Sequence, residues 1–144
     1  MTSFSDKEDL FAGAVFPNSP PQRNKSSKYG INKWFITVDE YEYNRFPPFI
    51  NAGGYIMSRH TMKRIYLASY FVKLFRFDDV YLGIVAKKCG ITLMTLCCEK
   101  FYKQKERTRK KSGMNLKSVI AAHLYLEREK VEDIWLQQVK LGNA

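Results

Sequence analysis

Three features of this sequence contain residue types that could carry chemistry. Gly53 and Gly54 are adjacent glycines that follow a pair of prolines. Asp78 and Asp79 are adjacent carboxylates at the expected start of a helix, and His123 lies within an apolar run. A carboxylate can act as a general base, paired glycines let backbone approach a ligand closely, and an imidazole can bind a metal ion. Each feature also has an ordinary structural explanation.

For the acidic pair, the two explanations carry about equal weight. Adjacent aspartates at a helix N-terminus usually cap the helix and interact with its dipole. To act as a base, a carboxylate must lie beside a pocket, within hydrogen-bonding reach of the proton that it removes. A helix start would hold either Asp78 or Asp79 in a fixed position for that role.

The glycine pair and the histidine are weaker signals when each is taken alone. Glycines near a strand also mark bulges or tight bends. A single histidine between apolar neighbours is more often a core residue than a ligand, and His123 has no HxxxH or HxH spacing beside it. Spacing alone therefore assigns no metal site.

Alternating strands and helices must position these residues. Apolar or β-branched runs predict strands at residues 10–16, 33–38, 52–58 and 91–96. The first run ends at Pro17, which cannot continue a strand interior. This alternation predicts an α/β fold with a mixed sheet flanked by helices.

Helix signals separate the strands. Ser58 is expected to cap a helix over residues 59–70, and Asp78-Asp79 to begin one that ends at Gly90. An amphipathic pattern predicts a last helix over residues 129–140. The first of these helices has one face at helical spacing, made of Met62, Ile65, Tyr66 and Ser69.

Composition limits the class of protein but does not identify a function. The 144 residues are 45% hydrophobic, which suits one globular domain, and they carry a net charge of +10. Such a charge favours an anionic partner: a nucleic acid, an acidic membrane surface or a phosphate-bearing small molecule. Seven of the basic residues fall between Lys100 and Lys111, a run typical of a solvated loop.

A series of motifs in fixed order is far more specific than any of these signals. The sequence reads FPPF at residues 46–49, AGGYIMS at 52–58 and FDDVYLG at 77–83. In order and spacing these blocks resemble the β-1,3-galactosyltransferase family, glycosyltransferase family 31, and its brainiac-like members most of all. That family reads YPPY, then G-x-x-Y-[VIL]-x-S, then [ED]-D-V-[YF]-x-G.

Further segments extend the resemblance in both directions. PPQR at residues 20–23 and KWFI at 33–36 are similar to the family's P-x-R and KWYVS segments. The likeness covers roughly residues 8–96, with a weaker tail that reaches DIW at 133–135.

The resemblance implies an activity, a cofactor and a location. It implies a GT-A fold and a hexosyltransferase that moves galactose or an N-acetylhexosamine from a UDP-sugar to a glycan or glycolipid acceptor. The new linkage would be β-1,3, formed with inversion, and Mn²⁺ would be the cofactor. The enzyme would act on the lumenal side of the Golgi membrane, held by an amino-terminal anchor, with no nucleic acid partner.

The resemblance also assigns roles to the residues above. Asp79 would be the general base that deprotonates the acceptor's 3-hydroxyl, and Asp78 would shape the same pocket. Gly53 and Gly54 would let the backbone close over the donor sugar. His123 would be a metal ligand.

One departure from the family limits this expectation. The family's D-x-D motif should precede residues 10–16, and no D-x-D occurs in this chain; DKED at residues 6–9 does not replace it. No run of about 18 apolar residues is present either. Residues 1–144 are therefore expected to form the carboxyl-terminal part of one catalytic domain, with little or no activity alone.

Two alternatives remain open at this point. The chain could be a non-catalytic family fragment that works as the partner of a complete transferase. It could instead be a basic module in which the run from Lys100 to Lys111 binds nucleic acid.

Overall fold

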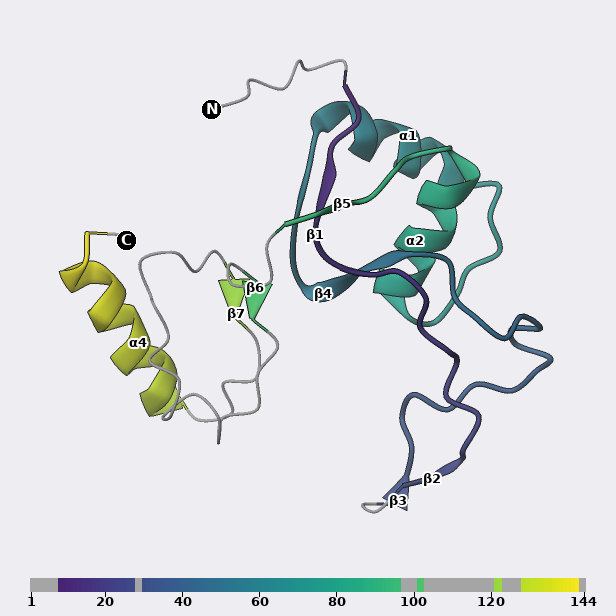
Figure 1. Ribbon diagram of the computed structural model, residues 1–144, viewed down its shortest axis with the longest axis horizontal. Helices are drawn as coiled ribbons and strands as arrows, with labels where there is room; N and C mark the ends of the chain where they lie inside the picture. Colours follow the sequence, from purple (N-terminus) through teal and green to yellow (C-terminus); the bar gives the residue numbers. More distant parts are fainter. Residues whose placement is uncertain (1–7, 28–29, 97–100, 103–120, 123–127, 143–144) are drawn as a thin grey trace.

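The computed structural model describes most of the 144-residue chain, and Figure 1 follows it from end to end. The described residues are 8–27, 30–96, 101–102, 121–122 and 128–142. The seven basic residues between Lys100 and Lys111 lie outside these ranges, and so does His123.

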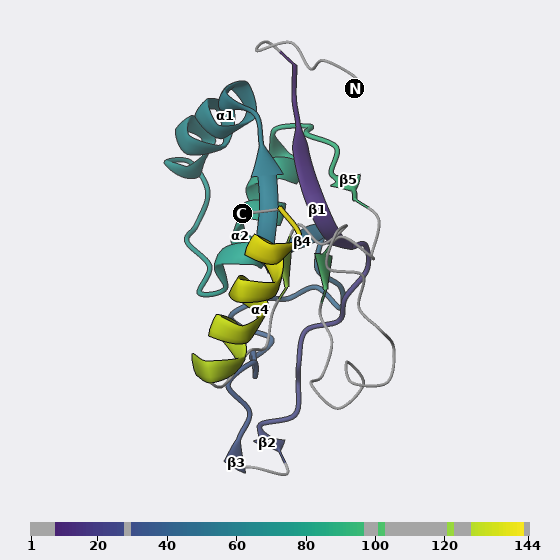
Figure 2. The same ribbon diagram turned by 90° about the vertical axis from the view of Figure 1, so that its left-hand side faces the viewer.

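A small mixed sheet forms the centre of the molecule. β1 spans Phe11–Phe16, β4 spans Phe49–Met57 and β5 spans Met94–Thr95. β1 pairs antiparallel with β4 and parallel with β5, and Figure 2 shows β1 between these two strands. The predicted mixed sheet is confirmed, although the strand expected at 91–96 is only two residues long.

Two helices cover this sheet, and both were predicted from the residue types at their first and last turns. α1 spans Arg59–Ser69, and the Ser58 side chain accepts a hydrogen bond from the Thr61 N–H, as a helix cap does. α2 spans Asp78–Lys88, with carboxylates in its first turn and lysines in its last. Gly90 follows with φ of +69°, a conformation that glycine adopts without steric cost.

The strand predicted at residues 33–38 is wrong. This segment is a turn and loop with a single bridge between Phe35 and Gln22. The reason is Arg23, whose guanidinium donates to the carbonyl oxygens of Ile36 at 3.0 Å and Thr37 at 2.6 Å. These carbonyls are therefore bonded to a side chain instead of to a neighbouring strand.

The remaining elements are short, apart from the last helix. β2 spans Ser26–Ser27 and pairs with β3, Gly30–Ile31, while β6, Phe101–Tyr102, pairs with β7, Ala121–Ala122. α4 spans Arg128–Lys140, which confirms the helix predicted at 129–140. None of the helices in the described ranges combines the length and hydropathy of a membrane span.

Two clusters of buried side chains join α2 to the sheet. One packs β1 and β4 against both helices: Phe11, Ile50, Ile65, Val85, Ala86 and Ile91. The other packs the loop after β3 against the start of α2: Ile36, Phe46, Phe49 and Val80. The first turn of α2 is thus fixed on its inner side by apolar contacts.

Gly83 lets α2 approach the entry to β4 more closely than any other residue would allow. A Cβ atom at this position would lie 2.6 Å from the Pro48 carbonyl oxygen and 2.6 Å from the Phe49 Cβ. Real carbon atoms do not approach this closely, so a side chain here would push the helix away from the strand.

We expect Gly83→Ala to lower the free energy of unfolding by about 1–2 kcal/mol. Alanine gains roughly 1 kcal/mol of helix propensity, whereas overpacking costs about 1–3 kcal/mol, and the cost here should be about 2–3 kcal/mol because both contacts are 2.6 Å and one is with backbone. Urea unfolding of the chain measures the difference. Lys87→Ala, on the exposed side of the same helix, is the control and should stay within about 0.5 kcal/mol of wild type. A Gly83→Ala chain as stable as wild type would contradict the close packing.

Candidate active site

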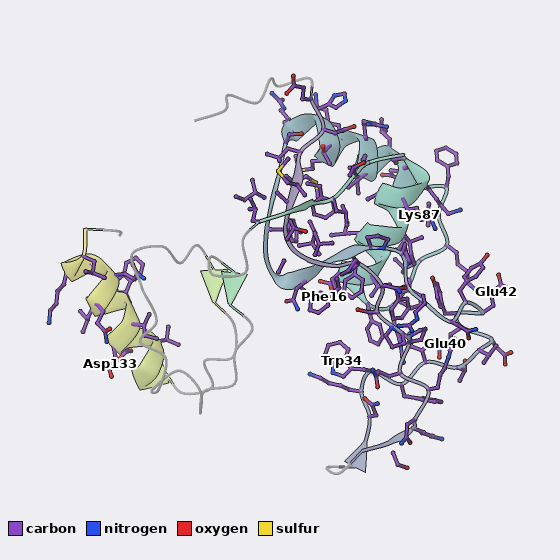
Figure 3. All side chains as sticks on the ribbon, viewed as in Figure 1. Phe16, Trp34, Glu40, Glu42, Lys87 and Asp133 are labelled. Carbon is purple, nitrogen blue, oxygen red and sulfur yellow. The ribbon has the colours of Figure 1, made fainter. Side chains whose placement is uncertain are left out.

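A cavity of about 350 Å³ opens where the end of β1, the middle of β4 and the first turn of α2 meet the loop that carries Trp34. Small-molecule sites measure roughly 300–1,000 Å³, with mostly apolar walls and a few polar groups. The aromatic lining residues are Phe16, Trp34, Phe46, Phe49 and Phe77. The polar ones are Ser19, Gln22, Asn32, Asn51 and Asp79. Figure 3 shows Phe16 at the end of β1 and Trp34 between that strand and the β2–β3 hairpin.

Asp79 is the carboxylate in this cavity. Its Oδ1 accepts the N–H of Val80 at 2.8 Å, and the backbone of Ala52 on β4 lies close enough to lower the pKa of its carboxyl. Asp79 therefore lies where the start of α2 meets the middle of β4. The bond from Val80 comes from a backbone group, so it holds the carboxylate without depending on another side-chain rotamer.

The surroundings make Asp79 a stronger base than an exposed aspartate. Burial raises the pKa of its carboxyl, and the nearby charge of Asp78 raises it further. The backbone groups of Val80 and Ala52 act in the opposite direction, but the net shift of the pKa is upward. A half-buried carboxylate with a raised pKa in a cavity is a typical feature of functional sites.

The glycine pair occupies a bulge in β4 that faces this cavity. β1 pairs Val15 with Ile50 and Gly13 with Tyr55, so residues 51–54 lie opposite a single residue of β1. The Asn51 side chain accepts the Gly53 N–H at 2.9 Å and shapes the bend. Bulges next to active sites commonly redirect side chains and end pairing. The structural explanation of these glycines, a bulge in the strand, is therefore confirmed, and the functional explanation stays a prediction.

The structure brings together some of the predicted site residues and separates others. Asp79 and Gly53 line the same cavity, but Gly54 and Asp78 are not among its lining residues. Gly54 turns its carbonyl toward Gly13 of β1. Asp78 is exposed, and its Oδ1 accepts the Asp79 N–H at 2.9 Å. It affects the site through its negative charge, which raises the pKa of Asp79.

No metal site can be built from the described residues. Within the described ranges, no group of three or more His, Cys, Asp or Glu side chains could hold a metal ion. Asp9, at the end of the acidic run 6–9, forms an ion pair with Arg64 and accepts the Thr61 hydroxyl at 3.0 Å. Asp9 therefore ties the entry of β1 to α1, while His123 lies outside the described part.

Sequence reasoning missed Trp34 and Asn51. Trp34 lay in a segment interpreted as a strand, and only the similarity of KWFI to a family motif marked it. The structure places its indole on the cavity wall, 5.2 Å from the Phe77 ring. Asn51 carried no sequence signal that would separate it from a surface amide.

A second hollow, of about 340 Å³, lies between β4 and the two helices. All four residues of the α1 face predicted from helical spacing line it, but Met62 and Tyr66 on that face remain more than half exposed. Its lining includes no carboxylate, histidine or cysteine, and its ionisable side chains are those of Tyr55, Tyr66 and Tyr81.

Comparisons with known proteins agree with the motif pattern. The Galactosyltransferase family model matches residues 2–96. The chain is 40% identical over 128 residues to "Beta-1,3-galactosyltransferase brn" of Drosophila melanogaster, a match that covers 89% of this chain and 36% of that protein.

The names of two other relatives also specify a 1,3 linkage. The chain is 38% identical over 89 residues to "Lactosylceramide 1,3-N-acetyl-beta-D-glucosaminyltransferase B" of Danio rerio, covering 61% of this chain and 22% of that protein. It is 34% identical over 92 residues to "N-acetyllactosaminide beta-1,3-N-acetylglucosaminyltransferase 4" of Mus musculus, covering 64% and 25%. The chain thus spans between a fifth and two fifths of these relatives.

We expect Asp79→Asn to make the chain more stable at neutral pH. Because the folded state raises the pKa of Asp79, it binds the proton more tightly than the unfolded state does. The stability from this group is full below the unfolded-state pKa and is lost as the pH rises through the folded-state pKa. Asparagine does not ionise, so the variant avoids this loss of stability. Its free energy of unfolding should exceed that of wild type at neutral pH, and the difference should shrink on acidification.

Urea unfolding at acid and neutral pH measures this difference, with Asp78→Asn as the matched control. Burial is the largest cause of the raised pKa of Asp79, so the Asp78→Asn variant should keep most of the pH dependence and lose only the part that comes from the Asp78 charge. An Asp79→Asn chain that loses stability at neutral pH and regains it on acidification would reverse the predicted sign.

Proposed function

This chain belongs to the galactosyltransferase family, and we propose that it supplies the acceptor-activating part of a β-1,3-hexosyltransferase site. The reaction would move galactose or an N-acetylhexosamine from a UDP-sugar to a hydroxyl of a glycan or glycolipid. The observation that carries this proposal is the cavity shared by Asp79 and Gly53, in which Asp79 is the lining carboxylate and has a raised pKa.

The chemistry assigned to Asp79 is proton removal from the attacking hydroxyl. As that oxygen forms a bond to the anomeric carbon, the bond from the same carbon to the UDP oxygen breaks, and UDP leaves with the electron pair. The hydroxyl proton passes to a carboxylate oxygen of Asp79. Attack from the face opposite UDP inverts the anomeric centre, which turns an α-linked donor into a β-linked product.

The surroundings of Asp79 suit this task in two ways. A raised pKa brings a carboxylate closer to the working pH, which favours proton transfer in the transition state. The backbone bond from Val80 to Oδ1 holds the group on the cavity wall, so little reorganisation is needed when the hydroxyl arrives.

The wider family properties are proposals of the same kind. We propose that residues 1–144 form part of one catalytic domain of GT-A type, acting on the lumenal side of the Golgi membrane. Mn²⁺ is the metal that the family resemblance favours. The described residues do not supply a site for it, so no step above depends on a metal ion.

We expect Asp79→Asn to lower kcat by about 10²–10⁴-fold, because it removes the general base, while UDP affinity stays near wild type. The assay follows transfer from UDP-galactose and UDP-N-acetylglucosamine. It uses this chain and a chimera in which residues 8–96 replace the matching segment of the Drosophila relative.

Asp78→Asn is the matched control, because Asp78 is exposed and outside the cavity lining. Its turnover should fall far less than that of Asp79→Asn. Equal turnover in the Asp79→Asn and parent chimeras would remove Asp79 from the role of base. An inactive parent chimera would favour a non-catalytic family member.

A further inference from the structure

Trp34 is an aromatic side chain that the base chemistry does not use. It is the largest side chain on the cavity wall, and 50% of its surface stays exposed. An exposed indole gains little from the hydrophobic effect, so its place on a cavity wall suggests contact with a ligand.

The backbone around Trp34 is held in place before any ligand binds. The Asn32 Oδ1 accepts the Trp34 N–H at 3.0 Å. Two residues later, Ile36 is fully buried, and its N–H donates to the Gln22 carbonyl at 2.9 Å. The Arg23 guanidinium also bonds the Ile36 carbonyl, so the loop that presents the indole is fixed on both sides.

Phe77 supports the indole from α2. The two ring centres lie 5.2 Å apart with the rings tilted by 58°. Phe77 caps the amino end of α2, two residues before Asp79. Trp34, Phe77 and Asp79 therefore line the same cavity.

We propose that Trp34, supported by Phe77, is the surface on which a pyranose ring of the acceptor stacks. This inference rests on the proposed function and adds the acceptor's binding mode. A pyranose gathers C–H bonds on one face and carries hydroxyls around its edge. The flat indole meets the C–H face, and the hydroxyl to be activated then points toward Asp79.

The polar lining fits a ring of hydroxyls. Gln22, Asn32 and Asn51 place side-chain amides around the cavity, and an amide has both donor and acceptor atoms. Asn32 and Asn51 each already accept a backbone N–H through Oδ1, and their amides keep further donor and acceptor capacity. A sugar hydroxyl both donates and accepts, so it can use that capacity.

The reaction geometry separates an acceptor sugar from the uracil of the donor. Both are flat enough to stack on an indole. In an inverting displacement, however, the attacking hydroxyl lies on the side of the base, and UDP departs on the opposite side. Because Trp34 and Phe77 line the same cavity as Asp79, we assign the stacked ring to the acceptor.

One present contact must change when the sugar binds. The Lys33 ammonium lies 4.6 Å from the centre of the indole ring, in a cation–π contact. Lys33 is exposed and its side chain is long and unbranched, so it can move aside for a ligand.

The test is saccharide binding by this chain, measured by calorimetry with methyl β-galactoside and methyl β-N-acetylglucosaminide, and with UDP as the second probe. A single pyranose offers few atoms, so millimolar affinity is expected. Trp34→Leu keeps an apolar side chain but loses the flat surface, and should weaken saccharide binding by about tenfold or more. Trp34→Phe keeps a flat ring and should stay within about threefold of wild type. UDP affinity should be the same in all variants.

Trp135→Leu is the matched control, because Trp135 is the second of the two tryptophans and is 60% exposed on α4. Its saccharide affinity should equal that of wild type. Circular dichroism checks that each variant is folded.

Three results would overturn the stacking proposal: no saccharide binding by the wild-type chain, unchanged binding in folded Trp34→Leu, or a loss of UDP affinity in place of saccharide affinity. The last result would assign Trp34 to uracil. Failure of the proposed function is a separate outcome, since it appears as full turnover in Asp79→Asn whatever the saccharide affinity.

Discussion

The close contact between α2 and the entry to β4 is the constraint on which the rest of this structure depends. Gly83 has no Cβ, so the helix lies directly against the backbone of Pro48 and Phe49. That distance sets where the first turn of α2 meets the bulge of β4. Asp79 then lies near Ala52 and lines the same cavity as Gly53. Gly83, the last residue of the FDDVYLG motif, thus helps to position Asp79, its third residue.

Local signals in the sequence predicted most of the elements, because each signal has a local physical cause. Ser58 caps α1, and α2 lies between paired carboxylates and a positive-φ glycine at Gly90. The strand expected at 33–38 is wrong because a distant residue, Arg23, binds the carbonyls of that segment. β propensity carries no information about such a partner.

The site depended on long-range geometry that no local pattern contains. Placing Asp79 beside Gly53 requires the β1–β4 register, the bulge at residues 51–54 and the packing at Gly83 together. The motif resemblance supplied Asp79 and Gly53 without that geometry. It could not show that Gly54 turns toward β1 or that Trp34 reaches the cavity. Asp79 is a half-buried carboxylate and Trp34 is a half-exposed aromatic side chain. Both depart from the usual burial of their residue types, as residues at functional sites often do.

The most direct test of this account is a crystal structure of the chain with methyl β-galactoside bound. The account predicts the sugar in the cavity of about 350 Å³, with one ring hydroxyl roughly 2.6–3.2 Å from a carboxylate oxygen of Asp79. A sugar bound elsewhere, or an Asp79 turned away from the cavity with no hydroxyl in reach, would contradict it.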